Sequence, residues 1–251
     1  MFMNCERENE ILRVLYLNRR MTVKEIADAI YVSESSVRRD LAVLEEKGLL
    51  QRFHGGAMLE GNGAQTLRNS YAVRKLMFES EKKQIARKAA SLIYQDHVIF
   101  LDSSTTCFHM LPFLLGLPDV TIITNSVEIL HKAPSDNKPL VIGTGGTLNA
   151  KHRTMYGEEA LSTVRKYFAN ICFISCGAYD GRGMASSLFK EENAVRRAMM
   201  EQSNATYLLC TSDKLGIRKA YPICSHEELK GIISTKPPTG IGIEKYIPAG
   251  A

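Results

Sequence analysis

The sequence predicts two domains: an N-terminal winged helix-turn-helix, mainly α with a small β wing, and a C-terminal α/β domain with a mainly parallel sheet. Residues 1–58 contain apolar patterns of helical period followed by two short alternating runs. From about residue 71, short apolar runs alternate with helical stretches, as in a sheet wrapped by helices. At 251 residues, 45% of them hydrophobic, the chain is long enough for both domains.

Two helices are predicted first. The segment Glu6–Leu17 has one apolar face, made by residues spaced three and four apart: Ile11, Leu12, Val14 and Leu15. Thr22 stands three residues before Glu25, the spacing of a capping box in which hydroxyl and carboxylate each accept a hydrogen bond from a backbone N–H. This pair predicts a second helix over Val23–Ile30.

A third helix is predicted to begin after the N-cap Ser33 and to end near Lys47, before Gly48. Its apolar side is formed by Val37, Leu41 and Leu44. Polar and basic residues lie on the other sides, namely Ser35, Ser36, Arg38 and Arg39. A guanidinium can bridge guanine O6 and N7 or bind a phosphate, and the N-terminal end of a docked helix faces the base edges. The pattern therefore indicates a DNA-reading helix.

An alternative applies to the paired arginines. Arg38 and Arg39 could simply solvate an exposed helix face and pair with Glu34 or Asp40, as most surface arginines do. The segment that follows favours the DNA interpretation, because a wing commonly accompanies such a helix.

The predicted wing spans residues 49–58, where two short alternating runs fold back at Gly55 and Gly56. Arg52 and His54 then become candidate phosphate contacts. With Thr22, Ser33 and the polar residues of the third helix, they make up the predicted DNA-binding set.

The C-terminal domain is predicted from a helix over Glu79–Tyr94 and from six apolar runs. These runs are Val98–Leu101, Val120–Thr124, Leu140–Ile142, Ile171–Cys176, Ala205–Cys210 and Gly231–Ser234. In an open parallel sheet, ligands collect beyond the carboxyl ends of the strands. Polar or glycine-rich loops follow five of the runs, which indicates a binding site at that edge.

The predicted effector-binding set comes from those loops. It consists of Asp102, Ser103, Ser104, Thr105, Thr106, Asn125, Ser126, Gly145, Gly146, Gly177, Asp213 and Lys214. Free backbone N–H groups at a hydroxyl-rich turn suit a phosphate, and a lysine could supply a balancing cation. Each loop alone has a plainer interpretation, since a Ser/Thr turn often only caps a helix and a glycine pair often only makes a turn. The run 143–146 is not a dinucleotide fingerprint.

Composition also limits the other classes of protein to which the chain could belong. Small and polar residues over 59–70 predict a linker between domains 1–58 and 71–251. No run of eighteen apolar residues and no apolar secretory core occur, so we expect a soluble cytoplasmic protein with no membrane partner. The six cysteines lack paired C-x-x-C spacing, which predicts reduced, mostly buried thiols. We expect no metal, cofactor or catalytic residue.

The charges are unevenly distributed. Residues 1–58 hold nine basic and nine acidic residues, so the predicted DNA-binding domain is formally neutral, whereas the whole chain carries +5. Residues 68–88 hold seven basic and two acidic residues. This segment could attract phosphate nonspecifically, face an anionic ligand or another subunit, or simply form a solvated helix.

Several motifs of the first domain resemble the DeoR family of bacterial sugar-metabolism repressors. They are Val23–Ala27, Val32–Leu41, Leu44–Glu45, Lys47–Gly48 and Arg52–Ala57. The resemblance implies a winged helix-turn-helix whose paired arginines lie on the recognition helix. Ser36 stands where the family more often has threonine, and a hydroxyl is retained there.

The resemblance extends through the second domain, over Asp102–Thr106, Thr124–Ser126, Gly145–Gly146, Gly157, Gly177 and Asp213–Lys214. It implies an effector domain similar in fold to ribose-5-phosphate isomerase and glucosamine-6-phosphate deaminase, which binds a phosphorylated sugar. Family members often carry glycine at the position of Ser104, and serine weakens the transfer of this site if the position needs φ > 0 or a very close approach of the backbone to the phosphate.

The expected function is a transcriptional repressor of a carbohydrate-utilisation operon. It would bind a double-stranded DNA operator as a homo-oligomer, a dimer or tetramer, and leave it when a phosphorylated sugar binds. Two alternatives remain open. An activator would use the same residues, and a sugar-phosphate isomerase or deaminase with an appended DNA-binding head could use Asp102, Asp180 or Asp213 as base beside Lys214.

Overall fold

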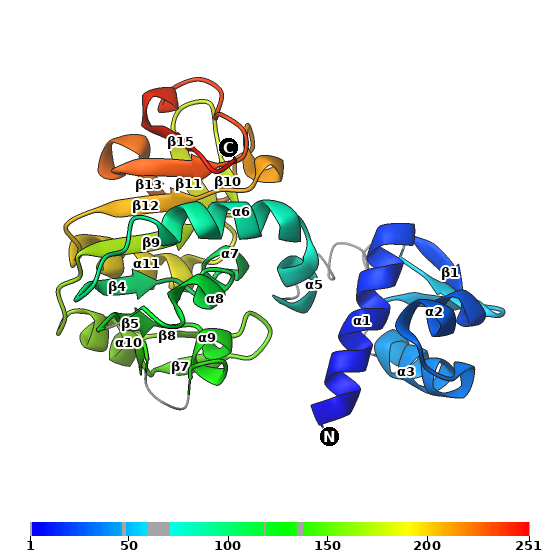
Figure 1. The fold of residues 1–251 in the computed structure, drawn as a ribbon. Helices are drawn as coiled ribbons and strands as arrows, with labels where there is room; N and C mark the ends of the chain where they lie inside the picture. The colour runs from blue at the N-terminus through cyan, green and yellow to red at the C-terminus, as the bar shows by residue number, and fades with distance from the viewer. Residues whose placement is uncertain (1, 47–48, 60–70, 118, 135–137, 251) are drawn as a thin grey trace. The chain divides into compact units, whose positions relative to one another are not determined.

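A computed structural model describes residues 2–46, 49–59, 71–117, 119–134 and 138–250. The chain divides into two compact units, Met1–Met77 and Phe78–Ala251 (Figure 1).

The first unit is a helix-turn-helix with a three-stranded antiparallel sheet. Its elements are α1 (Phe2–Asn18), β1 (Arg20–Thr22), α2 (Val23–Ile30), α3 (Glu34–Glu46), β2 (Gln51–Phe53), β3 (Gly56–Met58) and α5 (Tyr71–Leu76). The strand order is β1-β3-β2. The three predicted helices and the two wing strands are confirmed. Strand β1 was not predicted, because three residues between two helices are too few to show a period.

The core of this unit is formed by the predicted apolar faces. Ile11 and Leu15 of α1, Ile26 of α2 and Leu41 of α3 are almost completely buried together. Burial of such aliphatic side chains stabilises by about 1.5–3 kcal/mol each. The core therefore fixes which side of α3 faces outward.

The boundary between the units differs from the predicted one. Val73 of α5 is buried in the core of the first unit, and α5 packs against α1. The second unit therefore begins at Phe78 rather than near residue 71. Of the predicted linker, residues 60–70 lie outside the described residues, and Leu59 is buried in the same core.

The second unit is built on a seven-stranded sheet with the order β15-β14-β12-β9-β4-β5-β6, and every strand pair is parallel. The strands are β4 (Val98–Leu101), β5 (Thr121–Thr124), β6 (Leu140–Gly143), β9 (Ile171–Ser175), β12 (Thr206–Leu209), β14 (Gly231–Ser234) and β15 (Tyr246–Pro248). The parallel sheet and its six predicted strands are confirmed. The short edge strand β15 was missed.

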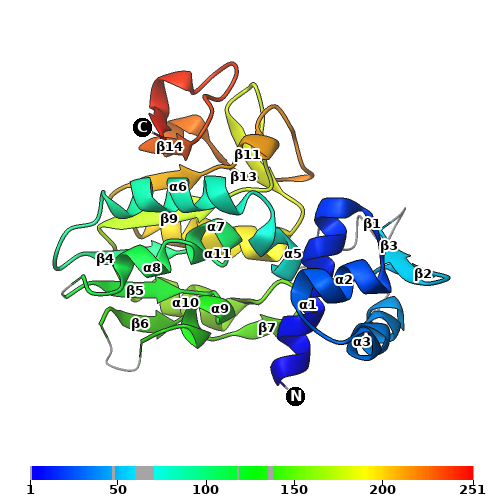
Figure 2. The same cartoon turned by 45° about the vertical axis from the view of Figure 1, so that its right-hand side comes forward.

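Helices cover both faces of this sheet (Figures 1 and 2). They are α6 (Glu79–Ala90), α7 (Thr105–Phe108), α8 (Leu111–Leu114), α9 (Val127–His131), α10 (Glu158–Val164) and α11 (Lys190–Glu201). Strand residues alternate between the two resulting cores. Ile99 and Leu101 pack with α6, α7 and α8, whereas Phe100 packs with α10 and α11.

The second unit also contains two small antiparallel sheets, separate from the seven-stranded sheet. One consists of β10 (Ala178–Tyr179), β11 (Met184–Ser187) and β13 (Tyr221–Ser225), and the other of β7 (Thr147–Asn149) and β8 (Thr154–Tyr156). Short 3-10 turns lie at η1 (Ser212–Lys214), η2 (His226–Glu228) and η3 (Ile243–Lys245). None of these was predicted, since each is too short to show a periodic pattern.

The basic segment 68–88 does not form one solvated helix. Arg74 and Lys75 belong to α5 of the first unit, whereas Lys82 and the residues that follow it belong to α6 of the second. Lys82 is only 3% exposed. Arg68 lies outside the described residues.

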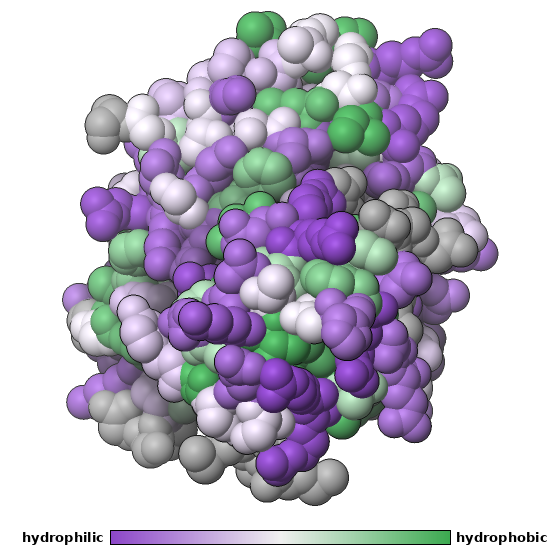
Figure 3. Space-filling view, turned by 90° about the vertical axis from the view of Figure 1, so that its right-hand side faces the viewer, coloured by the Kyte–Doolittle hydropathy of each residue, from purple (hydrophilic) through white to green (hydrophobic). Residues whose placement is uncertain are grey.

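None of the helices in the described part of the chain is both long and apolar enough to cross a bilayer. On the face shown in Figure 3, hydrophilic and hydrophobic residues are interspersed, as is usual for exposed protein surface.

The sheet order places a switch point at its centre. Strand β4 lies between β5 and β9, so the chain runs out to one edge through β5 and β6 and then returns to the other side of β4. Loops diverge at the carboxyl ends of strands flanking such a point, and ligands bind there in open parallel sheets.

Candidate functional site

The predicted recognition helix presents its two arginines outward. Arg38 and Arg39 are both exposed. Arg39 lies on the side of α3 opposite the buried Val37 and Leu41, and Arg38 lies beside that side. Nη2 of Arg38 lies 2.6 Å from a carboxylate oxygen of Glu34 in an exposed pair one helical turn apart. Such a pair contributes only about 0.3–0.5 kcal/mol, so Arg38 can exchange it for a phosphate at small cost.

Asp40, the second acidic residue that could have paired with Arg38 or Arg39, instead pairs with a residue of α1. Asp40 is buried and forms an ion pair with Arg7 of α1, in which Nη2 lies 3.0 Å from Oδ1. In the described part of the chain, no hydrogen bond or ion pair involves the guanidinium of Arg39. Arg39 is therefore available for an external partner.

Serine hydroxyls gather at the start of α3. The Oγ of Ser33 lies 3.0 Å from the Oγ atoms of both Ser35 and Ser36, and it accepts from the backbone N–H of Ser36 at 3.3 Å. Ser33 thus acts as the expected N-cap. The three hydroxyls can donate to phosphate oxygens or base edges, and their contact with DNA stays a prediction.

Thr22 forms the predicted capping box. Its Oγ1 accepts from the N–H of Glu25 at 3.2 Å, and its own N–H donates to the Glu25 carboxylate at 2.7 Å. The N–H of Thr22 and its hydroxyl, which donates to the same carboxylate at 2.9 Å, lower the pKa of Glu25. Thr22 therefore has a structural role in addition to the DNA contact predicted for it.

The wing is tied to α3. Glu45 accepts from the N–H of Arg52 at 2.8 Å, and its other oxygen lies 3.9 Å from a guanidinium nitrogen of Arg52. His54 is exposed in the turn between the strands. At Gly56 a Cβ would lie 2.3 Å from the carbonyl oxygen of Met21, so glycine is required for the strands to pair.

The unusual backbone and the exposure of Tyr31 were not predicted from the sequence. It follows α2 with a left-handed backbone, φ 55°, and its side chain is 94% exposed. Glycine usually occupies such a position because it has no Cβ to be strained, and asparagine is also found there because its short polar side chain can hydrogen-bond locally. The position of Tyr31 between two predicted helices could have indicated a left-handed residue at the end of α2.

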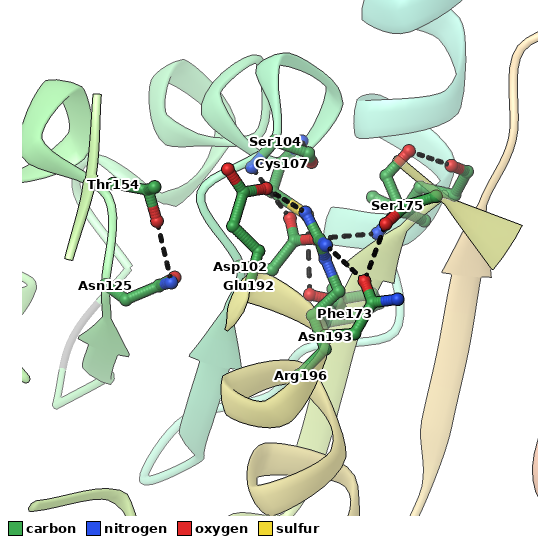
Figure 4. Close-up of polar contacts among 12 residues, drawn as sticks. Asp102, Ser104, Cys107, Asn125, Thr154, Phe173, Ser175, Glu192, Asn193 and Arg196 are labelled. Carbon is green, nitrogen blue, oxygen red and sulfur yellow. Dashed lines mark hydrogen bonds and ion pairs between the residues drawn. The ribbon is translucent and has the colours of Figure 1, made fainter. Parts of the chain in front are cut away.

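At the carboxyl edge of the parallel sheet, Asp102 is fully buried and organises its surroundings (Figure 4). It accepts from the backbone N–H groups of Ser104 at 2.9 Å and Ser175 at 3.0 Å, and from Nε of Arg196 at 2.8 Å. Burial raises the pKa of Asp102, but the charge of Arg196 and these hydrogen bonds outweigh it, so the pKa is lowered. Asp102 thus joins the loop after β4 to the last residue of β9 and to α11.

The backbone angle at Ser104 does not require glycine. Ser104 has φ −71°, an ordinary value, and its hydroxyl accepts from the N–H of Cys107 at 3.0 Å as the N-cap of α7. Ser103, Thr105 and Thr106 are buried beside it. The hydroxyl-rich turn is therefore formed as predicted, and its contact with an anion stays a prediction.

The loops after β5 and β6 supply further predicted residues. Asn125 donates to Thr154 of β8 at 3.0 Å, and Ser126 caps α9. Gly145 and Gly146 both have positive φ, and a Cβ at Gly146 would lie 2.5 Å from a carbonyl oxygen. These glycines are needed for the turn itself.

The loops after β9 and β12 meet through Lys214. Its Nζ lies 3.1 Å from the hydroxyl of Ser175, the last residue of β9, whose backbone N–H donates to Asp102. Gly177 does not have a positive φ, and its N–H donates to the carbonyl oxygen of Ser186. Asp213 is exposed, and no hydrogen bond of its side chain to a described residue was found. The structure thus brings Lys214, but not Asp213, to the Asp102 network.

Three buried residues of this network were missed. Arg196 also contacts Glu192, with Nη2 3.1 Å from Oε2, and His152 packs its ring on Phe189 near Glu192. Glu192 and Arg196 share the buried side of α11 with Val195. A Glu/Arg pair inside the apolar stripe of a charged helix was the signal that could have revealed them.

The thiols follow the prediction where the structure describes them. The cysteines at 107, 172, 176, 210 and 224 are buried and free, and the side chain of Cys5 lies outside the described residues. Sγ atoms of Cys176 and Cys210 lie 3.8 Å apart. Within the described residues there is no group of three or more His, Cys, Asp or Glu side chains able to hold a metal.

Family models match both units. One described as DeoR C terminal sensor domain matches residues 78–236, and one described as DeoR-like helix-turn-helix domain matches residues 7–61. Among curated proteins, the L-fucose operon activator of Haemophilus influenzae is 32% identical over 83% of this chain and 82% of its own length. The HTH-type transcriptional repressor GlcR of Bacillus subtilis is 30% identical over 93% and 89%.

Solved structures are more distant. The ribose 5-phosphate isomerase of Plasmodium falciparum matches with a TM-score of 0.41 at 18% identity, over 55% of this chain and 53% of its own. A likeness at this level says nothing about the site.

Proposed function

Because the chain belongs to the DeoR family of transcriptional regulators, we propose that it binds an operator through α3 and releases it when a phosphorylated sugar occupies the carboxyl edge of its parallel sheet. It would act as a repressor of a carbohydrate-utilisation operon. The observation that carries the DNA part is Arg39, which is exposed and has no described partner on a helix anchored by a buried apolar face.

The DNA contact would combine two kinds of residue. Arg39 and the Ser35 hydroxyl project from the N-terminal part of α3, where base edges are read. Arg52 and His54 project from the wing and would contact phosphates. The apolar anchoring of α3 and the Glu45 contact to the wing would hold these groups in a fixed geometry.

The effector contact would use both charge and hydroxyls. Lys214 supplies a cation, and the turn at Ser103–Thr106 supplies buried hydroxyls and backbone N–H groups at the switch point. This combination suits a ligand with a phosphate and a polar body. One relative is named for an L-fucose operon, which supports a sugar as the polar body of the ligand.

A homo-oligomer, a dimer or tetramer, is part of the proposal. One recognition helix reads few base pairs, whereas a symmetric pair reads two half-sites at a fixed spacing. A bound effector would favour an arrangement with a different spacing. A tenfold loss of operator affinity requires about 1.4 kcal/mol of difference between the two arrangements.

An enzymatic role is less well supported. A general base works best with a pKa near the operating pH. In Asp102, the charge of Arg196 and the hydrogen bonds outweigh burial and lower the pKa; in Asp180, hydrogen bonds from Met184 and Arg218 do the same. Relatives such as GlcR are named as regulators.

The test has two steps. Thermal unfolding of the full chain is first measured with pentose, hexose and ketose phosphates, because a ligand at a hundred times its dissociation constant stabilises by about 2.7 kcal/mol. Operator binding is then measured with and without the stabilising sugar phosphate. Stabilisation, release of operator and no turnover by NMR are the expected results. Turnover of the sugar phosphate would replace the proposal by the enzymatic alternative.

A further inference from the structure

One carboxylate oxygen of Glu192 accepts a hydrogen bond, and the other accepts none from a described residue. The residue is 5% exposed, and its Oε2 accepts from Nη2 of Arg196 at 3.1 Å. No donor among the described residues hydrogen-bonds to Oε1. The Nδ1 of His152 lies 3.8 Å from it, which is too far for a hydrogen bond. A buried acceptor in this state is unfavourable unless something donates to it.

Asn125 also has a buried oxygen that accepts no hydrogen bond from a described residue. Its Nδ2 donates to Oγ1 of Thr154 at 3.0 Å and to the carbonyl oxygen of Met155 at 3.1 Å. Reversing the amide would place its oxygen against that carbonyl, so the observed orientation is the favourable one. Its Oδ1 is buried and receives no hydrogen bond from a described residue.

The two acceptors belong to one place in the fold. The loop that carries His152 leads into β8, where Thr154 binds Asn125, and α11 packs on β8. Figure 4 shows the Oε1 side of Glu192 turned away from Arg196, on the side where Asn125 and Thr154 lie. Both acceptors are therefore beside the loop that begins at Asp102.

Their chemistry distinguishes the two ends of a sugar phosphate. A phosphate dianion offers only acceptor oxygens and would be repelled by a carboxylate. Sugar hydroxyls and ammonium groups donate. Glu192 and Asp102 also place two carboxylates against the single guanidinium of Arg196, which further favours a donor or a cation here.

We propose that Glu192, together with Asn125, recognises the sugar part of the effector by accepting hydrogen bonds from its hydroxyl or ammonium groups. The inference rests on the proposed function and deepens it. The phosphate would lie toward Lys214, and the sugar would extend toward β8. Glu192 would thereby decide which sugar phosphates are bound.

The test compares Glu192→Gln with Glu191→Gln in the full chain. Glu191 is the exposed neighbour on the same helix, so its substitution removes the same charge without reaching the site. The probes are ribose 5-phosphate, fructose 6-phosphate, glucose 6-phosphate and glucosamine 6-phosphate, titrated by calorimetry. Monodeoxy analogues of the tightest probe follow.

In Glu192→Gln an amide N–H can replace the acceptor. We expect affinity for the tightest probe to fall by about 10- to 100-fold, and affinity in Glu191→Gln to be unchanged. Wild type should lose a similar factor for one monodeoxy analogue, whereas Glu192→Gln should bind that analogue and the parent sugar alike. A preference of wild type for glucosamine 6-phosphate over glucose 6-phosphate that Glu192→Gln abolishes would identify the donor as ammonium.

Two results would overturn the inference: equal affinity of Glu192→Gln and wild type for every probe, or a weakened variant that still discriminates each deoxy analogue as wild type does. The second result would indicate a purely structural role. If wild type binds operator DNA but none of the sugar phosphates, the proposed function itself fails. The outcomes are therefore distinguishable.

Discussion

Asp102 and Arg196 form a buried ion pair, with Nε of Arg196 2.8 Å from Oδ2 of Asp102, at the point where the strand order of the sheet reverses. The pair joins the loop after β4 to α11. Because Asp102 also accepts from the N–H of Ser175, it holds three segments at the carboxyl edge in one arrangement. The proposed effector site is thus built on a rigid polar framework.

Arg196→Met is expected to destabilise the second unit strongly. It removes the guanidinium that both buried carboxylates, Asp102 and Glu192, contact, and removing one partner of a buried pair costs about 3–5 kcal/mol. Urea unfolding of the full chain, followed by circular dichroism, gives the free energy. The control is Arg165→Met, which removes an exposed pair with Glu158 and should cost at most about 1 kcal/mol. Equal losses in both variants would contradict the prediction.

The stability of the second unit should fall in acid. The charge of Arg196 and the hydrogen bonds of Asp102 outweigh burial and lower its pKa from 3.8, so its ionised form stabilises the fold above about pH 4. This contribution is lost as pH decreases through the folded-state pKa. The difference in unfolding free energy between wild type and Asp102→Asn should therefore shrink below about pH 4.

Hydrogen exchange at β4 and β9 of the full chain, measured between pH 3 and 6, would check this. The two proteins should differ most at the upper end of that range. A gap between them that widens toward pH 3 would show that the ionised carboxylate does not stabilise the fold.

Much of the fold could be predicted because its elements are long or strongly apolar. Val98–Leu101 and Gly231–Ser234 are buried on both faces, and each reads as a continuous apolar run. Strands β10 and β15 could not be found, because two or three residues carry no period. The unit boundary was misplaced because α5 has a helical pattern but nothing in the sequence says which core it joins.

The candidate site was predictable only in part. Loops after strands could be placed at one edge, since all parallel strands end on the same side. Arg196 and Glu192 lie on a helix instead, and charged helix residues are usually solvated. Their role depends on α11 packing over the switch point, a tertiary contact that the sequence does not reveal.

Tyr31→Asn is expected to stabilise the first unit by about 0.5–1 kcal/mol. The left-handed backbone at φ 55° strains a tyrosine, asparagine tolerates it, and a side chain 94% exposed loses little packing. The control is Tyr31→Ala, which also removes the ring but lacks the short polar side chain that lets asparagine adopt the left-handed backbone. Thermal unfolding compares the three proteins, and a gain in Tyr31→Ala equal to that in Tyr31→Asn would exclude relief of strain.

Thr22→Ala is expected to cost about 1 kcal/mol of the first unit's stability. It removes the acceptor for the N–H of Glu25 and so opens the capping box of α2. Thr22→Ser keeps the hydroxyl and should retain most of that free energy. Urea unfolding of both variants tests the point. If Thr22→Ala unfolds at the wild-type urea concentration, the box contributes nothing measurable.

Arg39→Ala is expected to weaken operator binding by about 1–3 kcal/mol and to relax the base preference at one position, as loss of a bidentate contact to guanine would. Arg52→Ala should weaken all DNA sequences alike and reduce the salt dependence, because a phosphate contact carries no base information. Fluorescence anisotropy with operator variants at several salt concentrations measures both effects.

Arg13→Ala is the matched control, since Arg13 is an exposed arginine of α1 that pairs with Glu10. Its operator affinity should equal that of wild type if α1 only supports the fold. The folding of each variant is checked by circular dichroism. Because the guanidinium of Arg39 has no partner among the described residues, its removal should leave the unfolding free energy within about 0.5 kcal/mol of wild type. Wild-type affinity and base preference in Arg39→Ala would therefore exclude this residue from the DNA contact without a folding defect to explain the result.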